Sequence, residues 1–266
     1  MSKRFLFFII LVPLHLSAQA GWVIIERTQG EGPDGASGST LYIQNNMIRS
    51  VDHDHVMIFD LNEWLLTYIN PGRSVYWTGP PAEYLHFIKA NILDYLKKEI
   101  STADEYDKPF LQAMYEDLKF DMEHGNDAVS FIGELPVEII MTDEWDRILG
   151  YRANQFLVYI DREMVEEIWL TRDISLNDEY DFEAFRSFVD EISWGGFFPD
   201  YRSSESYIHL MRSGLPLRTI EEGENGSVSI TEVVSIEETN IPESEFRPPS
   251  HYKSISLSDL GIELHW

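Results

Sequence analysis

Short runs of alternating apolar and polar residues fill the first quarter of the chain after residue 20 and predict β-strands. The runs lie at 22–28, 40–43, 47–51, 56–59, 64–69 and 74–78, with a loop expected at 30–39. Asn45-Asn46 fits a two-residue hairpin turn because asparagine tolerates positive φ. Asn70-Pro71-Gly72-Arg73 fits a type II turn with Gly72 at the position of positive φ. Connections this short predict antiparallel neighbours.

Spacings of three and four between apolar residues predict helices in two intervals. The first helix covers 81–100, and the second starts at Asp107 with Pro109 in its first turn and closes near Gly125. A third helix is expected at 182–192 and a short fourth one at 204–212, stopped by Gly214. Such amphipathic stripes are typical of packing on a sheet.

Further strands are predicted at 129–132, 137–142, 150–160, 164–171, 215–221, 227–238 and 254–257. Helices that fall in two interruptions of an antiparallel sheet must cover one of its faces. We therefore expect an α+β fold: a large curved antiparallel sheet of about ten strands, forming an open, incomplete β-barrel with helices packed in its concave face. It would form a single domain over 21–266, with helical insertions at about 81–124 and 178–213.

The first 20 residues have the three parts of a signal peptide. Lys3 and Arg4 precede an apolar run, and Ser17-Ala18-Gln19-Ala20 offers a small-x-small cleavage site. The run is short for an uncleaved membrane anchor, which is the competing interpretation. With no cysteine in the chain there is no site for lipid attachment, so we expect a soluble protein in the periplasm or the medium, without an integral membrane segment after cleavage.

Charge and composition narrow the function further. A formal net charge of −26 disfavours nucleic acid and anionic membranes as partners. The absence of cysteine excludes thiolate metal sites and thiol nucleophiles. The apolar share of 44% is enough to bury a core, which excludes a disordered chain.

Candidate catalytic and metal-binding motifs are weak. Alternate residues of Asp52-His53-Asp54-His55 would point to opposite faces of a strand, so a metal would need further ligands, and a solvated hairpin edge is the simpler interpretation. The same alternation separates the acidic doublets, including Glu166 and Glu167, which we expect on a solvated outer face. No G-x-S-x-G, Walker or Rossmann spacing is present. The sequence predicts no enzyme, no cofactor and no metal site.

The order of several short motifs resembles a known group of proteins. Gly21-Trp22, then Tyr68-Ile69-Asn70-Pro71, Gly150-Tyr151-Arg152-Ala153-Asn154 and Phe246-Arg247-Pro248-Pro249 follow one another as in an uncharacterised family of exported bacterial proteins, similar to a branch of the LolA/LolB lipoprotein-carrier superfamily. The resemblance covers nearly all of the chain after residue 20. It implies an unclosed β-barrel with helices in its hollow and a hydrophobic cavity between sheet and helices that holds acyl chains. The long N-terminal helix and the hairpin arginine of the carriers are missing here, so it implies apolar binding rather than lipoprotein trafficking.

The candidate function is therefore non-enzymatic binding of a hydrophobic small molecule, acyl chain or lipid. By alternation, the residues expected to line the cavity are Ile43, Ile58, Trp64, Leu66, Tyr68, Val158 and Trp169, opposed by Leu85, Ile88 and Ile92 on the first helix. The aromatic loop at 194–198 could gate the mouth of the cavity or act as a packing plug. The alternative is an interaction module whose hollow is filled by its own helices and whose acidic outside binds a protein partner.

Overall fold

The computed structural model describes residues 20–30, 36–124, 136–192, 201–223 and 227–260. The predicted signal peptide, the strand expected at 129–132 and the aromatic loop at 194–198 lie outside these residues, apart from Ala20. The strands are β1 (Gly21–Gly30), β2 (Ala36–Gln44), β3 (Met47–Val51), β4 (Val56–Asp60), β5 (Leu65–Asn70), β6 (Val75–Gly79), β7 (Val137–Ile148), β8 (Tyr151–Ile160), β9 (Glu163–Thr171), β10 (Leu215–Glu222), β11 (Val228–Thr239) and β12 (Lys253–Ser254). The helices are α1 (Pro81–Thr102), α2 (Lys108–His124), α3 (Phe182–Ile192) and α4 (Glu205–Arg212).

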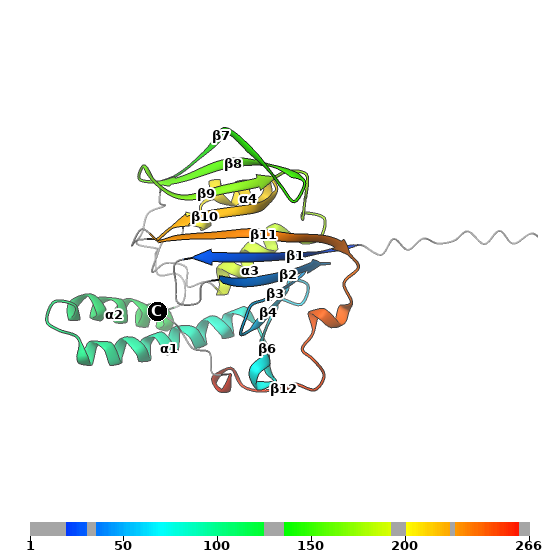
Figure 1. Ribbon diagram of the computed structural model, residues 1–266. Helices are drawn as coiled ribbons and strands as arrows, with labels where there is room; N and C mark the ends of the chain where they lie inside the picture. The colour runs from blue at the N-terminus through cyan, green and yellow to red at the C-terminus, as the bar shows by residue number, and fades with distance from the viewer. Residues whose placement is uncertain (1–19, 31–35, 125–135, 193–200, 224–226, 261–266) are drawn as a thin grey trace, which may run out of the picture.

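All twelve strands join one open sheet (Figure 1). The spatial order is β12-β6-β5-β4-β3-β2-β1-β11-β10-β9-β8-β7, and every pair is antiparallel except β12 with β6. The first strand, β1, lies in the middle of the sheet, where it pairs with β11, and the last strand, β12, lies at the edge beside β6. The predicted α+β class and open sheet are confirmed, and the described part of the chain has twelve strands in place of about ten.

The turns are partly as expected. Asn45 and Asn46 have φ of 52° and 60°, as a two-residue hairpin turn with the right twist requires. The prediction for Gly72 was wrong: residues Pro71–Arg73 form one 3-10 turn, capped by the Asn70 side chain, and the left-handed residue is Ser74, with φ 53°. The Asn70 carboxamide oxygen accepts the Arg73 backbone N–H at 3.1 Å, which favours this tighter turn.

Strand boundaries differ from the expectation in three places. β2 begins at Ala36, inside the expected loop, because its first residues pair with the end of β1 through the backbone. β7 continues to Ile148, past an irregularity between Met141 and Trp145 that interrupts the alternation. The last strand is only two residues long and parallel to β6, and residues Leu257–Asp259 form a 3-10 turn.

Helices α1, α3 and α4 cover the concave face of the sheet. Figure 1 shows α3 behind β1 and β2 and α4 behind β9 and β10. Phe188 of α3 joins Leu66 and Trp77 in one buried cluster, and Tyr207 and Leu210 of α4 join Phe156 and Ile168 in another. The middle strands carry a third cluster around Ile24 and Leu217.

The convex face is covered over β4 and β5 by the C-terminal part of the chain. Ile241 and Phe246 pack on Val56, Ile58 and Ile69. The Gln44 side chain fixes this segment, because its Nε2 donates to the Ile241 carbonyl at 3.2 Å and its Oε1 accepts the Ile241 N–H at 2.8 Å. Both faces of this half of the sheet are therefore buried.

Helices α1 and α2 form a hairpin that extends beyond the sheet (Figure 1). Ile92, Leu96 and Leu118 make its own small core, and Lys89 of α1 bonds to Asp121 of α2 at 2.5 Å. No helix in the described ranges is long and apolar enough to cross a membrane.

Strand β7 forms one edge of the sheet and carries exposed apolar side chains. Ile140, Met141 and Trp145 are between 42% and 59% exposed. The irregular stretch between Met141 and Trp145 holds the exposed acids Asp143 and Glu144.

Candidate functional site

Helix α3 packs on the concave face through edge-to-face aromatic contacts. Phe188 is fully buried, with its ring 5.8 Å from Phe59 and 5.1 Å from Trp64, both edge to face. Trp64 adopts φ 56°, which a bulky residue rarely does, and its indole N–H donates to Glu191 of α3 at 2.7 Å. The strained turn residue therefore ties α3 to the sheet by both a ring contact and a hydrogen bond.

Helix α1 lies beside α3 over β5 and β6. Tyr84 packs near Trp77, with 6.3 Å between the ring centroids, and burial raises the pKa of Tyr84 to about 12. Tyr68 is half-buried and stacks on His55 at 5.3 Å. The layer between the helices and this half of the sheet is thus rich in aromatic side chains that are buried or partly buried.

The ten predicted cavity residues are spread over the molecule rather than gathered in one place. Trp64, Leu66 and Tyr68 lie together beneath α1 and α3. Ile43 and Trp169 belong to the middle cluster, Val158 to the cluster under α4, and Ile88 and Ile92 to the core of the helical hairpin. Leu85 is buried on α1, and Ile58 lies on the convex face under the C-terminal segment.

The stretch Asp52-His53-Asp54-His55 is the connection between β3 and β4. The side chains of His53 and Asp54 are 85% and 88% exposed and bonded to each other at 2.8 Å. Within the described ranges, no group of three or more histidines and carboxylates is placed to hold a metal ion.

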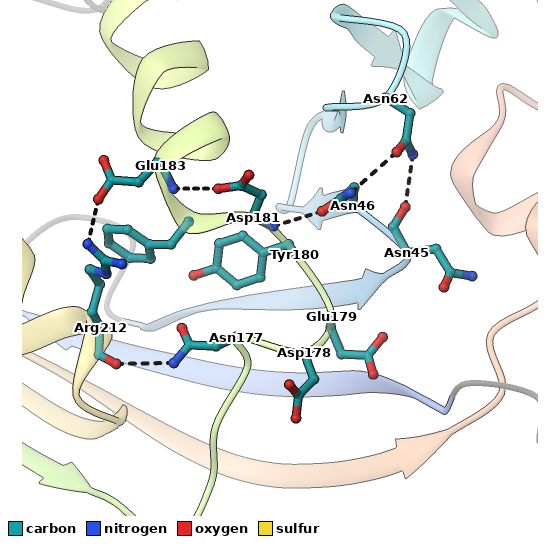
Figure 2. A pocket seen from close by; sticks show the side chains of 11 residues that line it. Asn45, Asn46, Asn62, Asn177, Asp178, Glu179, Tyr180, Asp181, Glu183 and Arg212 are labelled. Atoms are coloured by element: carbon teal, nitrogen blue, oxygen red, sulfur yellow. Dashed lines mark hydrogen bonds and ion pairs between the residues drawn. The ribbon is translucent and has the colours of Figure 1, made fainter.

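A pocket of about 680 Å³ opens at the start of α3 (Figure 2). Its walls come from the β2–β3 turn, the β4–β5 turn, the segment before α3 and the end of α4. The lining residues are Asn45, Asn46, Asn62, Asn177, Asp178, Glu179, Tyr180, Asp181, Phe182, Glu183 and Arg212. None of the ten predicted cavity residues is among them, and the lining is polar and acidic.

Hydrogen bonds hold the two turns and the segment before α3 in place. The Asn46 N–H donates to the Glu179 carbonyl at 2.8 Å, and the Asp181 N–H donates to the Asn46 side-chain oxygen at 2.7 Å. The Asn62 side chain donates to the Asn45 carbonyl at 2.9 Å. Figure 2 shows the bonds of Asn46 to Asp181 and of Asn62 to Asn45 on one side of Tyr180, and the ion pair of Arg212 with Glu183, 2.5 Å long, on the other.

Glu179 is the unusual member of the pocket. It is 7% exposed, and its Oε2 has no hydrogen-bond partner in the part of the chain that the structure describes. Burial raises its pKa, the Asn45 backbone N–H opposes that shift, and the charges of Asp178 and Glu238 raise the pKa further. Glu179 could not be predicted from the sequence, because nothing in its local pattern marks it as buried.

A second buried carboxylate, Glu166, lies under α4. The expectation of a solvated Glu166 was wrong: it is 2% exposed and accepts hydrogen bonds from Tyr201 at 3.1 Å and Tyr207 at 3.4 Å. Arg202 lies 3.9 Å from it and 2.8 Å from Glu221. Burial raises the pKa of Glu166, and Arg202 opposes the shift only in part.

Glu166→Gln is expected to flatten the pH dependence of stability. Because the folded-state pKa is raised above the ordinary value of 4.5, the favourable contribution of Glu166 is complete below that value and is lost as pH rises through the raised pKa. Wild type should therefore gain stability relative to the variant between neutral pH and pH about 5. Urea unfolding at several pH values measures this difference. The exposed Glu163→Gln serves as control, and an equal slope in wild type and Glu166→Gln would contradict the expectation.

Comparison with known proteins gives a family and several distant folds. The family model described as Domain of unknown function (DUF4412) matches residues 112–252, just over half of the chain. No curated protein matches.

The similar solved structures share little sequence with this chain. A structure of PNGF-II is 11% identical over 91% of this chain and 32% of that one, with a TM-score of 0.36. A crystal structure of MucB is 10% identical over 88% and 59%, with a TM-score of 0.35. A LolA superfamily protein from Nitrosomonas europaea is 9% identical over 87% and 91%, with a TM-score of 0.28. This chain thus spans about a third of PNGF-II and less than two thirds of MucB.

Proposed function

We propose that this chain, which belongs to the DUF4412 family, is an exported, non-enzymatic binding protein. It would take up an acyl chain or lipid between the concave face of its sheet and helices α1 and α3. The observation that supports this proposal is the way α3 is held. The helix has 11 residues, which is too short to be stable alone in water. The helix therefore stays folded through its contacts with the side chains beneath it, which include Phe59, Trp64 and Leu66. A hydrophobic ligand can compete for contacts with the same side chains.

The polar links of α3 are few and lie near its two ends. Glu183 bonds to Arg212 at the start, and Glu191 accepts the indole N–H of Trp64 near the end. Between these links the helix rests on apolar contacts with Phe59 and Leu66. Burial of apolar surface is not directional, so a flexible acyl chain can replace part of it without new hydrogen bonds. Trp64, Leu66 and Tyr68, all predicted from the sequence, would form the floor of the site.

The alternative is an interaction module, favoured by the packing of the hollow. Phe188 already fills the space between α3 and the sheet, and the pocket beside α3 is acidic. A protein partner with a basic surface would then bind outside the sheet, and its affinity would fall steeply with salt.

Native mass spectrometry of the chain from Gly21 onward tests the proposal. We expect a co-purified acyl chain or lipid, and rebinding of a fluorescent fatty acid after solvent extraction. Trp64→Phe removes the hydrogen bond to Glu191 and should speed release of the probe about tenfold or more, since one charge-assisted bond contributes about 1.5–3 kcal/mol. Trp145→Phe, on the exposed edge strand, is the matched control. An empty protein that also fails to bind the probe would overturn the proposal in favour of the interaction module.

A further inference from the structure

The first part of β7 presents backbone groups to which another strand can bind. Residues 137–141 pair with β8 in regular register, and in the described part of the chain no strand lies on their other side. An antiparallel strand directs its N–H and C=O groups to both sides, so this run presents a row of them along the edge of the sheet. Such a row can receive an extended peptide as an additional strand.

Side-chain packing holds this run in its extended form. Val137 and Ile139 lie on the concave face, where they pack against the buried cluster under α4. The residues that alternate with them lie on the opposite face of the strand, where Glu138 and Ile140 are exposed. The strand is therefore ordered before a partner binds, which lowers the entropic cost of binding.

The charges along this edge indicate the chemistry of the partner. Residues 137–144 contain three acids and no basic residue. These acids are Glu138, Asp143 and Glu144, and none of them forms an ion pair with a described residue. A second copy of β7 along this edge would bring its own acids to them, and like charges directly opposite destabilise a strand pair. A segment with basic residues would be attracted instead.

The arginines of β7 and β8 lie away from this run. Arg147 and Arg152 are cross-strand neighbours of each other, beyond the break in the register. The cross-strand neighbour of Glu138 in β8 is Tyr159, which is not a basic residue. Glu138 thus has no cation opposite it on the paired side, and a basic side chain in a strand on the outer side can pair with it.

We propose that the outer edge of β7 at residues 137–141 binds an extended segment of another protein, in which an apolar residue lies between basic ones. The apolar side chain packs on Ile140, and the basic ones lie near Glu138 and near the acids at 143 and 144. Backbone hydrogen bonds supply the affinity, and the side-chain contacts supply the selectivity. The inference does not depend on the proposed apolar site, since none of the residues beneath α3 takes part.

Nuclear magnetic resonance titration of the isotope-labelled chain from Gly21 onward tests the proposal. The probe is the blocked peptide acetyl-Lys-Thr-Val-Thr-Lys-amide. We expect shift changes confined to residues 137–141 and their neighbours in β8, with a dissociation constant of about 1 mM or tighter. An analogue that is N-methylated at every residue keeps both charges but has no backbone donor. It should bind about tenfold more weakly or less, as for the loss of two hydrogen bonds.

Charge reversal at Glu138 tests the selectivity. Glu138→Lys should weaken binding of the basic peptide about fivefold, because a repulsive cross-strand pair replaces an attractive one. It should strengthen binding of the analogue that has glutamate at both lysine positions. Glu222→Lys makes the same charge change at an exposed position of the internal strand β10, and it should change the affinity less than twofold.

Four results would overturn the proposal. Equal weakening by Glu138→Lys and Glu222→Lys would show a general charge effect. Equal binding of the N-methylated analogue, or shift changes away from β7, would exclude addition of a strand at this edge. A failure of the basic peptide to bind while the thermal unfolding of wild type is normal would exclude the site. Shift changes at 137–141 that depend on protein concentration without peptide would assign the edge to a second copy of the chain.

Discussion

Replacing Phe188 with alanine is expected to lower the free energy of unfolding by about 3–5 kcal/mol. Phe188 is fully buried at the centre of the contact between α3 and the sheet, and its ring meets Phe59 and Trp64. The substitution removes the apolar surface of the ring and leaves a cavity that the rigid strands below cannot fill. Since α3 is too short to hold its shape alone, it should be the first element to detach.

Urea unfolding measures this loss, and Phe110→Ala is the matched control. Phe110 is also on a helix but is 64% exposed, so its removal should change stability by no more than about 0.5 kcal/mol. An apolar dye should bind Phe188→Ala more strongly than wild type, because the apolar side chains beneath α3 become exposed to solvent. A loss below about 1 kcal/mol for Phe188→Ala would mean that α3 is held by something other than this contact.

Gly214→Ala is expected to be similarly damaging, for a different reason. A Cβ at Gly214 would lie 2.0 Å from the Thr171 carbonyl oxygen and 2.7 Å from Leu170 Cδ2. The clashing oxygen belongs to the backbone of Thr171 in β9, and this residue pairs with Leu215 of β10. Turning a side chain therefore cannot relieve the clash. Separating two internal strands is expected to destabilise the fold by about 3 kcal/mol, the upper range for an overpacked interior.

Gly30→Ala is the control for this second variant. Its Cβ would have only ordinary contacts, the nearest at 3.8 Å, in a strand of the same sheet. Thermal unfolding should therefore show a large decrease for Gly214→Ala and little change for Gly30→Ala. Unfolding of both variants at the wild-type temperature would contradict the close approach of the two strands at Gly214.

Elements that depend on neighbours in the sequence, such as one hairpin turn and two of the helices, could be predicted. Asn45-Asn46 identified its hairpin because few residue pairs tolerate two positive φ values. The stripes of α1 and α3 identified both helices to within two residues, since each has a single apolar face. Gly214 was expected as a helix stop, and α4 does end at Arg212, but the structural need for glycine there is the approach of the Thr171 backbone.

Features that depend on partners distant in sequence could not be predicted in this way. Glu166 was expected in solvent because its neighbours on the strand are ordinary, and only the packing of α4 buries it with Tyr201 and Tyr207. Glu179 is buried by turns more than a hundred residues earlier in the chain. The face of Ile58 depended on the register of β3 with β4, where Phe59, and not Ile58, pairs with Ile48.

The irregular stretch of β7 bears on how copies of this protein behave toward one another. An open sheet has free edges, and a long edge strand with exposed apolar side chains is a template on which another strand can add. In β7 the hydrogen-bonding register breaks between Met141 and Trp145, and the exposed charges of Asp143 and Glu144 fall inside the break. A second molecule that aligned its own β7 there would bring like charges together across a ladder with a gap. We therefore expect the interruption between Met141 and Trp145 to act against polymerisation through this edge of the sheet.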